Sequence, residues 1–253
     1  METRQDVRIL LLEAREDPEL IDHERQCLLR AGRLGASQIV PHDMLRTPPS
    51  PDLLEGFHAV MIGGTGDFSV ARNRPPFFQP LVDLTLHLLE IGMPTLGLCY
   101  GHHLMGLAVG GEVQTRPDMG ETGTFEVVLT EEGRRDPLLG HLPGRFLAQQ
   151  GHHDAVLSVP APFQMLATSQ RCRWQALRHP DKPFYGLQFH PELGRADLLY
   201  RMLRYAETYA STPEKLAEIE RQVQETSIQD VIARFIDHVV LPQAKGTPVP
   251  GPK

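Results

Sequence analysis

The chain has 253 residues, of which 41% are hydrophobic and 23% charged, and its net charge at pH 7 is −7. This composition is typical of a globular protein with a large core, and the absence of a long basic run argues against nucleic acid or an anionic membrane as a partner. The first residues lack the apolar core of a signal peptide, and three widely spaced cysteines fit a reducing compartment better than a disulfide framework. We therefore expect a cytoplasmic protein without a membrane span.

Short apolar runs alternate with helical patterns over the first 110 residues. Strands are expected at Val7–Leu12, Gln38–Val40, His58–Ile62 and Thr95–Leu98, and helices at 18–34 and Phe77–Ile91. Asp17-Pro18 is a good cap and first-turn pair for the first helix, and Gly92 suits the end of the second. Strands that alternate with helices predict an α/β fold whose central parallel sheet is covered on both faces.

The second half of the chain is richer in strand patterns than in helices. Five further strands are expected, at Thr124–Thr130, Arg145–Gln149, Gln164–Thr168, Arg173–Arg178 and Phe184–Phe189. They predict a smaller antiparallel or mixed extension of the same sheet, followed by helices at 194–209 and 213–240. We expect a single domain over residues 1–209, a C-terminal helical extension over 210–241 and a disordered tail over 242–253, which is rich in proline and glycine.

Cys99 is the strongest candidate for a nucleophile. It follows the predicted strand Thr95–Leu98, has glycines at positions 97 and 101, and precedes a helical pattern. Small residues two before and two after a nucleophile allow a sharp turn from strand to helix. At a helix N-terminus, backbone N–H groups and the helix dipole favour the thiolate over the thiol.

His190 and Glu192 are the candidates for a base and the residue that orients it. Pro191 separates them and favours an extended backbone at His190, so that their side chains point to the same side. Glu192 could then hold the imidazole while His190 exchanges a proton with Cys99. A structural turn with a solvated glutamate is the alternative for this segment alone.

A glycine-rich turn, Gly63-Gly-Thr-Gly66, follows the predicted strand His58–Ile62. Such a turn exposes backbone N–H groups at the edge of a parallel sheet where ligands bind. We expect the N–H groups of Gly64 and Tyr100 to form an oxyanion hole. A plain turn and a phosphate-binding loop are the alternatives, although the segment lacks the Lys-Ser/Thr ending of a P-loop.

Together, Gly97-Leu-Cys-Tyr-Gly101, the glycine-rich turn and Gln188-Phe-His-Pro-Glu192 resemble class I (triad-type) glutamine amidotransferases. The resemblance covers about residues 7–205 and is strongest to the glutaminase domain of GMP synthase and its stand-alone relatives. It implies a flavodoxin-like fold and a thioester mechanism in which Cys99, His190 and Glu192 release ammonia from the glutamine side chain. In such enzymes ammonia usually passes to a second active site, so the resemblance implies either a separate synthetase subunit as partner or a hydrolase that acts alone.

The resemblance further implies a substrate site beside Cys99, with one departure from the family pattern. Its candidate residues are Gly63, Thr65, His103, His152, His153 and Asp154. Where the family usually has glutamine four residues after the nucleophile, this chain has His103, whose neutral ring offers one donor and one acceptor in different positions. His102 and His103 as ordinary helix residues, and His152–Asp154 as a solvated loop, are the alternatives.

Two other functions fit the same residues. The triad could hydrolyse γ-glutamyl peptides or other γ-glutamyl compounds without transferring ammonia, or the fold could serve as a binding or regulatory module without turnover. The remaining histidines show no shared ligand spacing, so we expect no metal and no cofactor. The expected partners are a small-molecule substrate and an ammonia-accepting synthetase.

Overall fold

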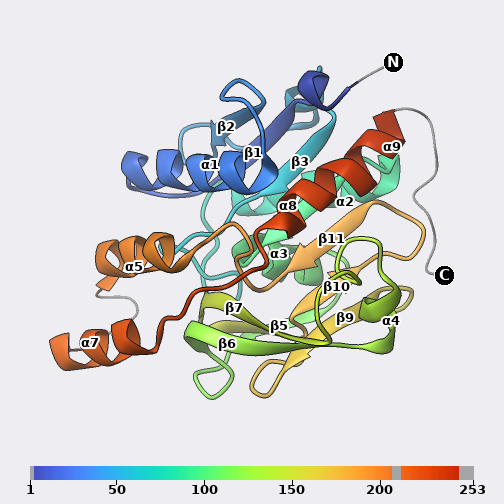
Figure 1. Ribbon diagram of the computed structural model, residues 1–253. Helices are drawn as coiled ribbons and strands as arrows, with labels where there is room; N and C mark the ends of the chain where they lie inside the picture. The colour runs from blue at the N-terminus through green and yellow to red at the C-terminus, as the bar shows by residue number, and fades with distance from the viewer. Residues whose placement is uncertain (1–2, 207–211, 245–253) are drawn as a thin grey trace.

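Nine strands form one sheet in the spatial order β2-β1-β3-β4-β11-β10-β9-β6-β7 (Figure 1). The computed structural model describes residues 3–206 and 212–244. The strands are β1 (Ile9–Glu13), β2 (Ile39–Asp43), β3 (Ala59–Ile62), β4 (Thr95–Leu98), β6 (Glu121–Leu129), β7 (Arg145–His152), β9 (Gln164–Ser169), β10 (Ala176–Arg178) and β11 (Phe184–Leu187). Strands β2, β1, β3, β4 and β11 are parallel, whereas β10, β9, β6 and β7 pair antiparallel. The predicted parallel sheet with an antiparallel extension is confirmed.

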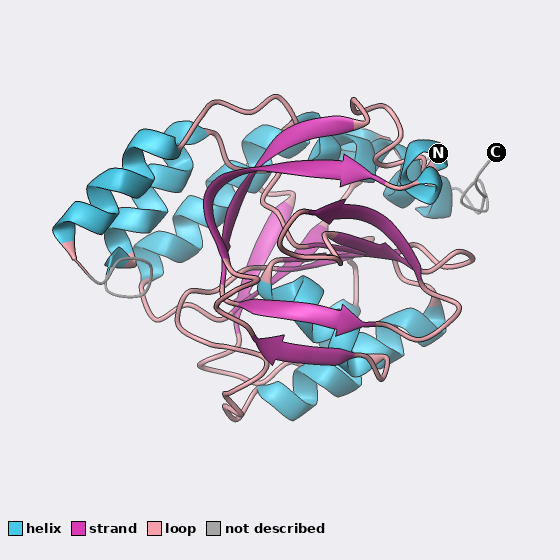
Figure 2. Cartoon of the chain, turned by 90° about the horizontal axis from the view of Figure 1, so that it is seen from below, coloured by secondary structure: helices cyan, strands magenta, loops and turns pink. Residues whose placement is uncertain are grey.

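Helices cover both sides of the sheet (Figure 2). They are α1 (Pro18–Gly32), α2 (Phe78–Ile91), α3 (Tyr100–Ala108), α4 (Glu131–Arg135), α5 (Arg195–Arg204), α7 (Pro213–Gln222), α8 (Asp230–Phe235) and α9 (Leu241–Ala244), with short 3₁₀ turns at Arg4–Asp6 and Pro51–Leu54. Asp17 caps α1 by accepting a hydrogen bond from the N–H of Glu19, and Gly92 ends α2 in the left-handed conformation, as the sequence predicts.

The alternation of side chains along β1 explains the two covering layers. Ile9 and Leu11 are buried in the same cluster as Leu28 of α1, whereas Leu10 and Leu12 are buried with residues of α2 and α3. Successive side chains of a strand point to opposite faces, so a strand that is apolar throughout must be covered on both sides. The uninterrupted apolar run at the start of the chain is therefore a central strand.

Strand β11 joins the parallel and antiparallel parts of the sheet. The segment Phe184–Phe189 was expected in the antiparallel or mixed extension, and β11 makes this region mixed, because it pairs in parallel with β4 and antiparallel with β10. This pairing brings the end of β11 beside the end of β4. His190 thereby follows a strand that is a direct neighbour of the strand before Cys99.

A second, two-stranded antiparallel sheet joins β5 (Glu112–Thr115) to β8 (Asp154–Ser158). Neither strand is predicted from the sequence, because both are short and the polar run before β8 resembles a loop. Strand β8 packs on α3, where a Cβ on Gly106 would lie 3.2 Å from a methyl group of Val156. The small sheet thus covers α3 and holds Asp154 near its N-terminal end.

The C-terminal segment differs from the helix expected over 213–240. Helix α7 ends at Gln222, and a new helix begins only at Asp230, continuing through a π-helical turn at Ile236–Val240. The second part packs on α1 of the same chain, since a Cβ on Gly32 would lie 3.2 Å from Ile236 and 3.3 Å from Ile232. Residues 242–244 of the expected tail are helical. Residues 207–209 of the expected helix and 245–253 of the tail lie outside the described residues.

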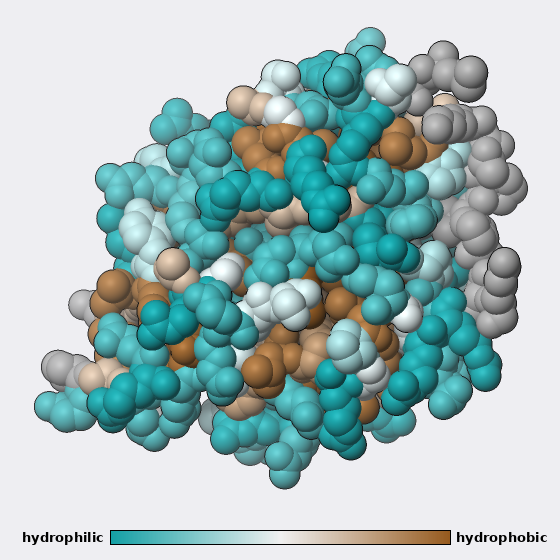
Figure 3. Space-filling view, in the orientation of Figure 1, coloured by the Kyte–Doolittle hydropathy of each residue, from teal (hydrophilic) through white to brown (hydrophobic). Residues whose placement is uncertain are grey.

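Apolar side chains form separate patches on the face seen in Figure 3, each surrounded by polar ones. One patch lies where Figure 1 places α5, the helix that carries Leu203, whose exposed fraction is 56%. Within residues 3–206 and 212–244, no helix combines the length and the hydrophobicity that a membrane span requires.

Candidate active site

Cys99 lies at a sharp turn between β4 and α3. Its backbone angles are φ +50° and ψ −96°, a region that residues other than glycine rarely adopt. Its N–H donates a hydrogen bond to the carbonyl of Leu187 at 2.8 Å, which ties the turn to the end of β11. The side chain is almost buried, with 4% exposed. The backbone strain lifts the thiol out of the sheet at the N-terminal end of α3.

The two glycines that flank Cys99 are required by close packing. A Cβ on Gly97 would lie 2.4 Å from Met105 Sδ and 2.6 Å from the carbonyl carbon of Gly101. A Cβ on Gly101 would lie 2.3 Å from the carbonyl oxygen of Ile62. No side chain fits at such distances without displacing backbone atoms. The predicted need for small residues on both sides of Cys99 is confirmed.

His190 and Glu192 are held together beside Cys99. Nδ1 of His190 lies 2.8 Å from Oε1 of Glu192, and this oxygen also accepts a hydrogen bond from Arg201 Nη1 at 3.2 Å. Burial alone would lower the pKa of His190, but the charge of Glu192 and hydrogen bonds with Cys99 and Glu192 outweigh it and raise the pKa to about 9. Near neutral pH the ring is therefore an imidazolium that faces the sulfur.

Glu192 is kept ionised although it is buried. Burial alone would raise the pKa of this carboxyl, but the charge and hydrogen bond of His190 and the charge of Arg201 lower it below its usual value. A carboxylate fixed between a histidine and a guanidinium has little freedom to rotate. It can hold the imidazole in one orientation and stabilise its positive charge.

The glycine-rich turn passes against both Cys99 and His190. A Cβ on Gly64 would lie 3.1 Å from Cε1 of His190 and 3.6 Å from Cβ of Cys99. The N–H of Gly64, however, donates to Oε1 of the buried Glu24 at 3.0 Å. In this conformation it is not available to an oxyanion, contrary to the expectation from sequence. Tyr100 is the first residue of α3, where backbone N–H groups have no partner within the helix.

A buried ionic cluster behind the turn explains the hydrogen bond of Gly64. Nε of Arg15 lies 2.6 Å from Glu24 Oε2 and 3.6 Å from Glu13 Oε2. Burial and repulsion from Glu24 raise the pKa of Glu13 well above its usual value, so Glu13 is the protonated member of the pair. Gly63 packs on these carboxyl groups, where its Cβ would lie 3.0 Å from Glu24 Oε1, and it lines neither cavity beside Cys99. The expected contact of Gly63 with a substrate is therefore not supported.

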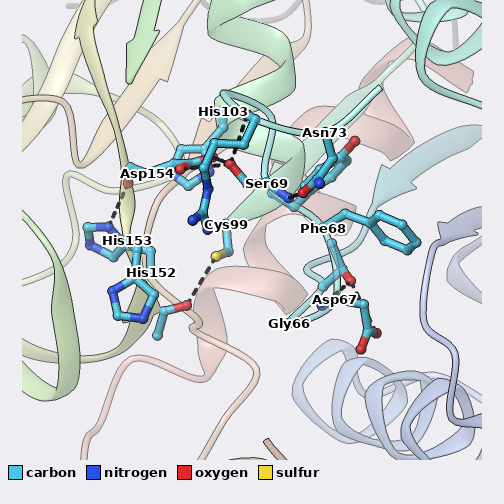
Figure 4. Close-up of a pocket in the computed structure, with 14 residues that line it drawn as sticks. Gly66, Asp67, Phe68, Ser69, Asn73, Cys99, His103, His152, His153 and Asp154 are labelled. Atoms are coloured by element: carbon cyan, nitrogen blue, oxygen red, sulfur yellow. Dashed lines mark hydrogen bonds between the residues drawn. The ribbon is translucent and has the colours of Figure 1, made fainter. Parts of the chain in front are cut away.

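Two cavities meet at Cys99. The first has a volume of about 80 Å³ and lies between the segment after β3 and the polar run before β8, as Figure 4 shows. Its walls are Thr65, Gly66, Asp67, Phe68, Ser69, Arg72, Asn73, Cys99, Tyr100, His103, Gly151, His152, His153 and Asp154. The second, of about 20 Å³, lies on the side of His190. The structure thus places five of the six predicted substrate residues around one cavity.

His103 lines the first cavity, but one of its ring nitrogens is already engaged. Nε2 donates to Oε1 of Gln188 at 2.6 Å, and the amide nitrogen of Gln188 lies 3.9 Å from the Cys99 sulfur. Burial lowers the pKa of His103 to about 4, so the ring is neutral. Its neighbour His102 points into the core and hydrogen-bonds the carbonyl of Trp174 at 2.8 Å. His103, which stands where the family usually has glutamine, therefore orients Gln188 through this hydrogen bond.

The polar residues before and at the start of β8 have different roles. The carboxylate of Asp154 accepts hydrogen bonds from Ser69 Oγ at 2.7 Å, Thr115 Oγ1 at 2.6 Å and the N–H of Ala71 at 3.2 Å. It thereby fixes the segment after β3 against the small sheet. His152 is similarly engaged, because its Nδ1 lies 2.8 Å from the carbonyl oxygen of Asp154. His153 lies at the edge of the cavity (Figure 4).

Several residues near Cys99 were missed by the sequence analysis. Glu13 is the last residue of β1 and Arg15 follows it closely, whereas Arg201 and Tyr205 come from α5 and the residue after it. Glu13 interrupts an apolar run at the carboxyl end of a predicted parallel strand, and such ends converge on ligand sites, so a signal for Glu13 was present. Arg201 contacts His23 of the first helix, and Tyr205 contacts Asp67, which follows the glycine-rich turn. Both partners are more than 100 residues away in the chain, and nothing in the local sequence marks Arg201 or Tyr205.

One group of side chains in the described residues has the composition of a metal site. Ligand atoms of His23, Cys27 and Asp197 lie within 4.8 Å of one another, between α1 and α5. Arg30 lies among them, 2.6 Å from Asp197 and 3.4 Å from the Cys27 sulfur. Burial raises the pKa of the Cys27 thiol to about 12. The guanidinium of Arg30 therefore forms an ion pair with Asp197 beside the protonated thiol of Cys27. This positive charge disfavours a metal cation at the same place.

A family model and the sequences of known proteins were compared with the chain. Residues 25–203 match the model for class-I glutamine amidotransferases. The chain is 33% identical over 164 residues to a subunit of the glutamine-hydrolyzing GMP synthase of Methanocaldococcus jannaschii, covering 64% of this chain and 78% of that protein. It is 37% identical over 157 residues to the corresponding subunit of Methanothermobacter thermautotrophicus, covering 62% and 75%.

Solved structures agree on the fold. A glutamine amidotransferase from Thermotoga maritima superposes with a TM-score of 0.72 at 20% identity, covering 93% of this chain and 99% of the other. A glutamine amidotransferase from Methylobacillus flagellatus gives a TM-score of 0.70 at 21% identity, covering 98% and 97%. The arrangement of sheet and helices is therefore shared with proteins whose sequences have diverged widely.

Proposed function

The chain belongs to the class-I glutamine amidotransferase family, and from this premise we propose that it hydrolyses the side-chain amide of glutamine through Cys99, His190 and Glu192. The observation that carries the proposal is the strained turn at Cys99, directly beside a histidine that is charged and held by a buried carboxylate. Strain of this kind persists only where surrounding packing maintains it, and it is concentrated at functional sites.

The first half of the reaction forms a thioester. The thiolate of Cys99 attacks the side-chain carbonyl carbon of glutamine, and the carbonyl electrons move to oxygen. The tetrahedral intermediate collapses, the carbon–nitrogen bond breaks, and the His190 imidazolium donates its proton to the leaving nitrogen. Neutral ammonia and a glutamyl thioester result, and His190 is left neutral.

The second half regenerates the thiolate. Neutral His190 takes a proton from water, and the resulting hydroxide attacks the thioester carbon. Collapse of this intermediate breaks the carbon–sulfur bond, which releases the side-chain carboxylic acid and restores the pair of thiolate and imidazolium. The acid loses its proton to solvent and leaves as glutamate. Glu192 stabilises the positive ring in both resting and final states without accepting the proton.

The N–H of Tyr100 is the proposed donor to the oxyanion in both steps. It opens α3 beside Cys99, where the helix dipole also favours negative charge. A second donor from the glycine-rich turn would require Gly64 to exchange its hydrogen bond with Glu24 for one to the substrate. Removal of one such donor typically lowers the rate by about 10²–10³.

The ammonia is proposed to pass to a separate synthetase subunit. The relatives that the chain matches over about three quarters of their length are subunits of GMP synthase, as their names state. A chain that resembles one subunit of such a synthase would need a partner to use its ammonia. Co-purification from the native host, followed by mass spectrometry, tests for that subunit.

Labelling with a glutamine-analogue electrophile, 6-diazo-5-oxo-L-norleucine, tests the central proposal. We expect stoichiometric labelling at Cys99, ammonia release from glutamine, and loss of both in Cys99→Ala. Cys27 and Cys172 serve as internal controls, because burial raises the pKa of each thiol to about 12. An intact protein that is neither labelled at Cys99 nor active on glutamine would contradict the proposal and favour a binding module.

A further inference from the structure

The two cavities beside Cys99 have different linings. The first is bounded largely by polar side chains, including Asp67, Arg72 and Asn73. The second is bounded by His190 and by the apolar side chains of Leu193, Leu198 and Met202, together with Arg15, Arg201 and Tyr205. Among the described residues, only Thr65, Gly66, Cys99 and Gly151 belong to both. The nucleophile thus lies where a polar cavity and a smaller, more apolar one meet.

The position of His190 identifies the side from which the leaving group departs. If His190 donates a proton to the departing nitrogen, that nitrogen must lie within hydrogen-bond reach of its ring. His190 lines the second cavity and does not line the first. The glutamyl part of the substrate therefore occupies the polar cavity, and the leaving amine enters the second.

The second cavity is very small. Its volume is about 20 Å³, and a cavity needs roughly 10–15 Å³ in this measure to hold one water. Ammonia is similar in size to water and fits. An amino acid released from a γ-glutamyl peptide is several times larger than ammonia and does not fit unless a wall moves.

Tyr205 is the wall that limits this cavity on its outer side. It lines both the second cavity and a hollow on the surface formed with Glu16, Asp17, Leu203 and Arg204. Its ring lies directly on Gly66, where a Cβ would be 2.8 Å from three ring atoms. The ring therefore separates the space beside His190 from the surface of the molecule.

The hydroxyl of Tyr205 keeps the ring in place. It donates to Asp67 Oδ2 at 3.0 Å and accepts a hydrogen bond from Arg15 Nη1 at 3.1 Å. The side chain is 9% exposed. Asp67 follows the glycine-rich turn directly and Arg15 belongs to the buried ionic cluster, so the ring is fixed to both structures that surround Cys99.

The charged groups around this cavity favour a neutral occupant. Arg15 and Arg201 both line it, and Arg201 Nη2 is buried and has no hydrogen-bond partner among the described residues. Such a donor can bind the lone pair of ammonia or of water, whereas an ammonium ion has no lone pair with which to accept the hydrogen bond. The cavity is therefore suited to ammonia after the first step and to the attacking water before the second.

We infer that Tyr205 is a specificity-determining residue that closes the leaving-group cavity and restricts the substrate to a primary amide, which excludes γ-glutamyl peptides. The inference rests on the proposed glutamine hydrolysis. It assigns the leaving group, and not the glutamyl part, as the portion of the substrate on which selectivity depends.

A graded series of leaving groups tests this inference in the full-length protein. The substrates are glutamine, γ-glutamylmethylamide and γ-glutamylglycine, with kcat/KM measured by glutamate release. We expect the wild-type protein to favour glutamine over the methylamide by at least about tenfold and over the peptide by at least about 100-fold, since one extra methylene at a tight site costs roughly 10–200-fold. In Tyr205→Ala, the ratio of glutamine to peptide should fall about tenfold or more, through a gain on the peptide.

Three further variants make the result interpretable. Tyr205→Phe keeps the ring and should retain most of the wild-type selectivity. Tyr205→Leu keeps apolar bulk but lacks the ring over Gly66, and it replaces the alanine variant if that variant does not fold. Tyr200→Ala is the matched control, because Tyr200 lies on α5, is 36% exposed, stacks on His23 and lines a different hollow. Its selectivity should equal that of the wild type.

The outcomes separate the inference from the function on which it rests. If the wild type releases ammonia from glutamine but cleaves γ-glutamylglycine equally well, the inference is wrong and the function stands. The same holds if folded Tyr205→Ala or Tyr205→Leu keeps the wild-type ratio. If the wild type acts on none of the three substrates and Cys99 is not labelled, the proposed function itself fails.

Discussion

The parallel and antiparallel parts of the sheet contribute different things to the site. The parallel part supplies the proposed reacting groups, because Cys99, His190 and the glycine-rich turn all follow the carboxyl ends of neighbouring parallel strands. The antiparallel part and the small β5–β8 sheet supply walls of the polar cavity beside Cys99, namely Gly151, His152 and Asp154.

The backbone and side chains of the two parts differ accordingly. The parallel part contains the strained backbone of Cys99, a residue other than glycine with a positive φ. In the other part, Asp154 and His152 are held by hydrogen bonds within the protein. Changes in the first part should therefore affect the chemical step, whereas changes in the second should affect substrate binding.

Cys99→Ser should have the largest effect and tests the first half of this comparison. A hydroxyl has a far higher pKa than a thiol and is a weaker nucleophile near neutral pH, so we expect kcat to fall by at least about 10³-fold. Serine is as small as cysteine, so the melting temperature should change by less than a few degrees. Activity near that of the wild type would remove Cys99 from the mechanism.

Glu192→Gln should give the next largest loss. The amide keeps the size of the side chain but cannot stabilise the His190 imidazolium, so kcat should fall by about 10²–10⁴ while KM changes little. Steady-state kinetics on glutamine measure both constants. A rise in KM with unchanged kcat would place Glu192 among the binding residues. It would contradict the assignment of the chemical step to the parallel part of the sheet.

The pH dependence of stability sharpens the role assigned to His190. Its pKa is raised from 6.5 to about 9, so its charge stabilises the folded state fully below pH 6.5, and this stabilisation is lost as pH rises through about 9. One unit of difference between the folded-state and unfolded-state pKa corresponds to about 1.4 kcal/mol. The charge of His190 therefore contributes up to about 3 kcal/mol to the free energy of unfolding. Urea unfolding at pH 6 and pH 9.5 should show a decrease that is much smaller in His190→Ala. An equal decrease in both proteins would contradict the raised pKa.

Asp154→Asn tests the part of the molecule that forms the walls. Loss of the charge weakens the hydrogen bonds from Ser69, Thr115 and Ala71, which loosens one side of the polar cavity. We expect KM for glutamine to rise about tenfold, which corresponds to about 1.4 kcal/mol, while kcat falls less than about threefold. Asp118→Asn is the control, since Asp118 is exposed and pairs with Arg116. A large fall in kcat without a change in KM would be the contrary result.

His103→Gln should have the smallest effect. The family usually has glutamine at this position, and a glutamine amide can donate to the same Gln188 oxygen that His103 contacts. KM for glutamine should therefore stay within about threefold of the wild-type value. A tenfold improvement would mean that position 103 contacts the substrate directly.

The sequence predicted most of the parallel part of the fold. Apolar runs, the Asp17-Pro18 cap and Gly92 placed the first strands and helices within a few residues of their observed ends. Local signals were sufficient there because each strand is buried on both faces and each helix has a distinct start and stop. Strands β5 and β8 were missed because they are short and partly polar, and only their mutual pairing makes them strands.

The candidate triad was also readable from sequence, since a nucleophile between glycines and a His-Pro-Glu segment are local patterns. Their spatial relation was not readable, because it depends on the pairing of β11 with β4, two strands that are far apart in the chain. The occupied N–H of Gly64 likewise depends on Glu24, a residue of the first helix.

What the sequence determined by itself was the set of candidate reacting groups and the local turn at Cys99, because steric limits on backbone angles act over a few residues. The tertiary structure alone decided the partners of those groups: the bond from His103 to Gln188, the ionic cluster under the glycine-rich turn and the ring of Tyr205 over Gly66. Hydrogen bonds and close packing join side chains that are distant in the chain, and such contacts leave no local pattern in the sequence.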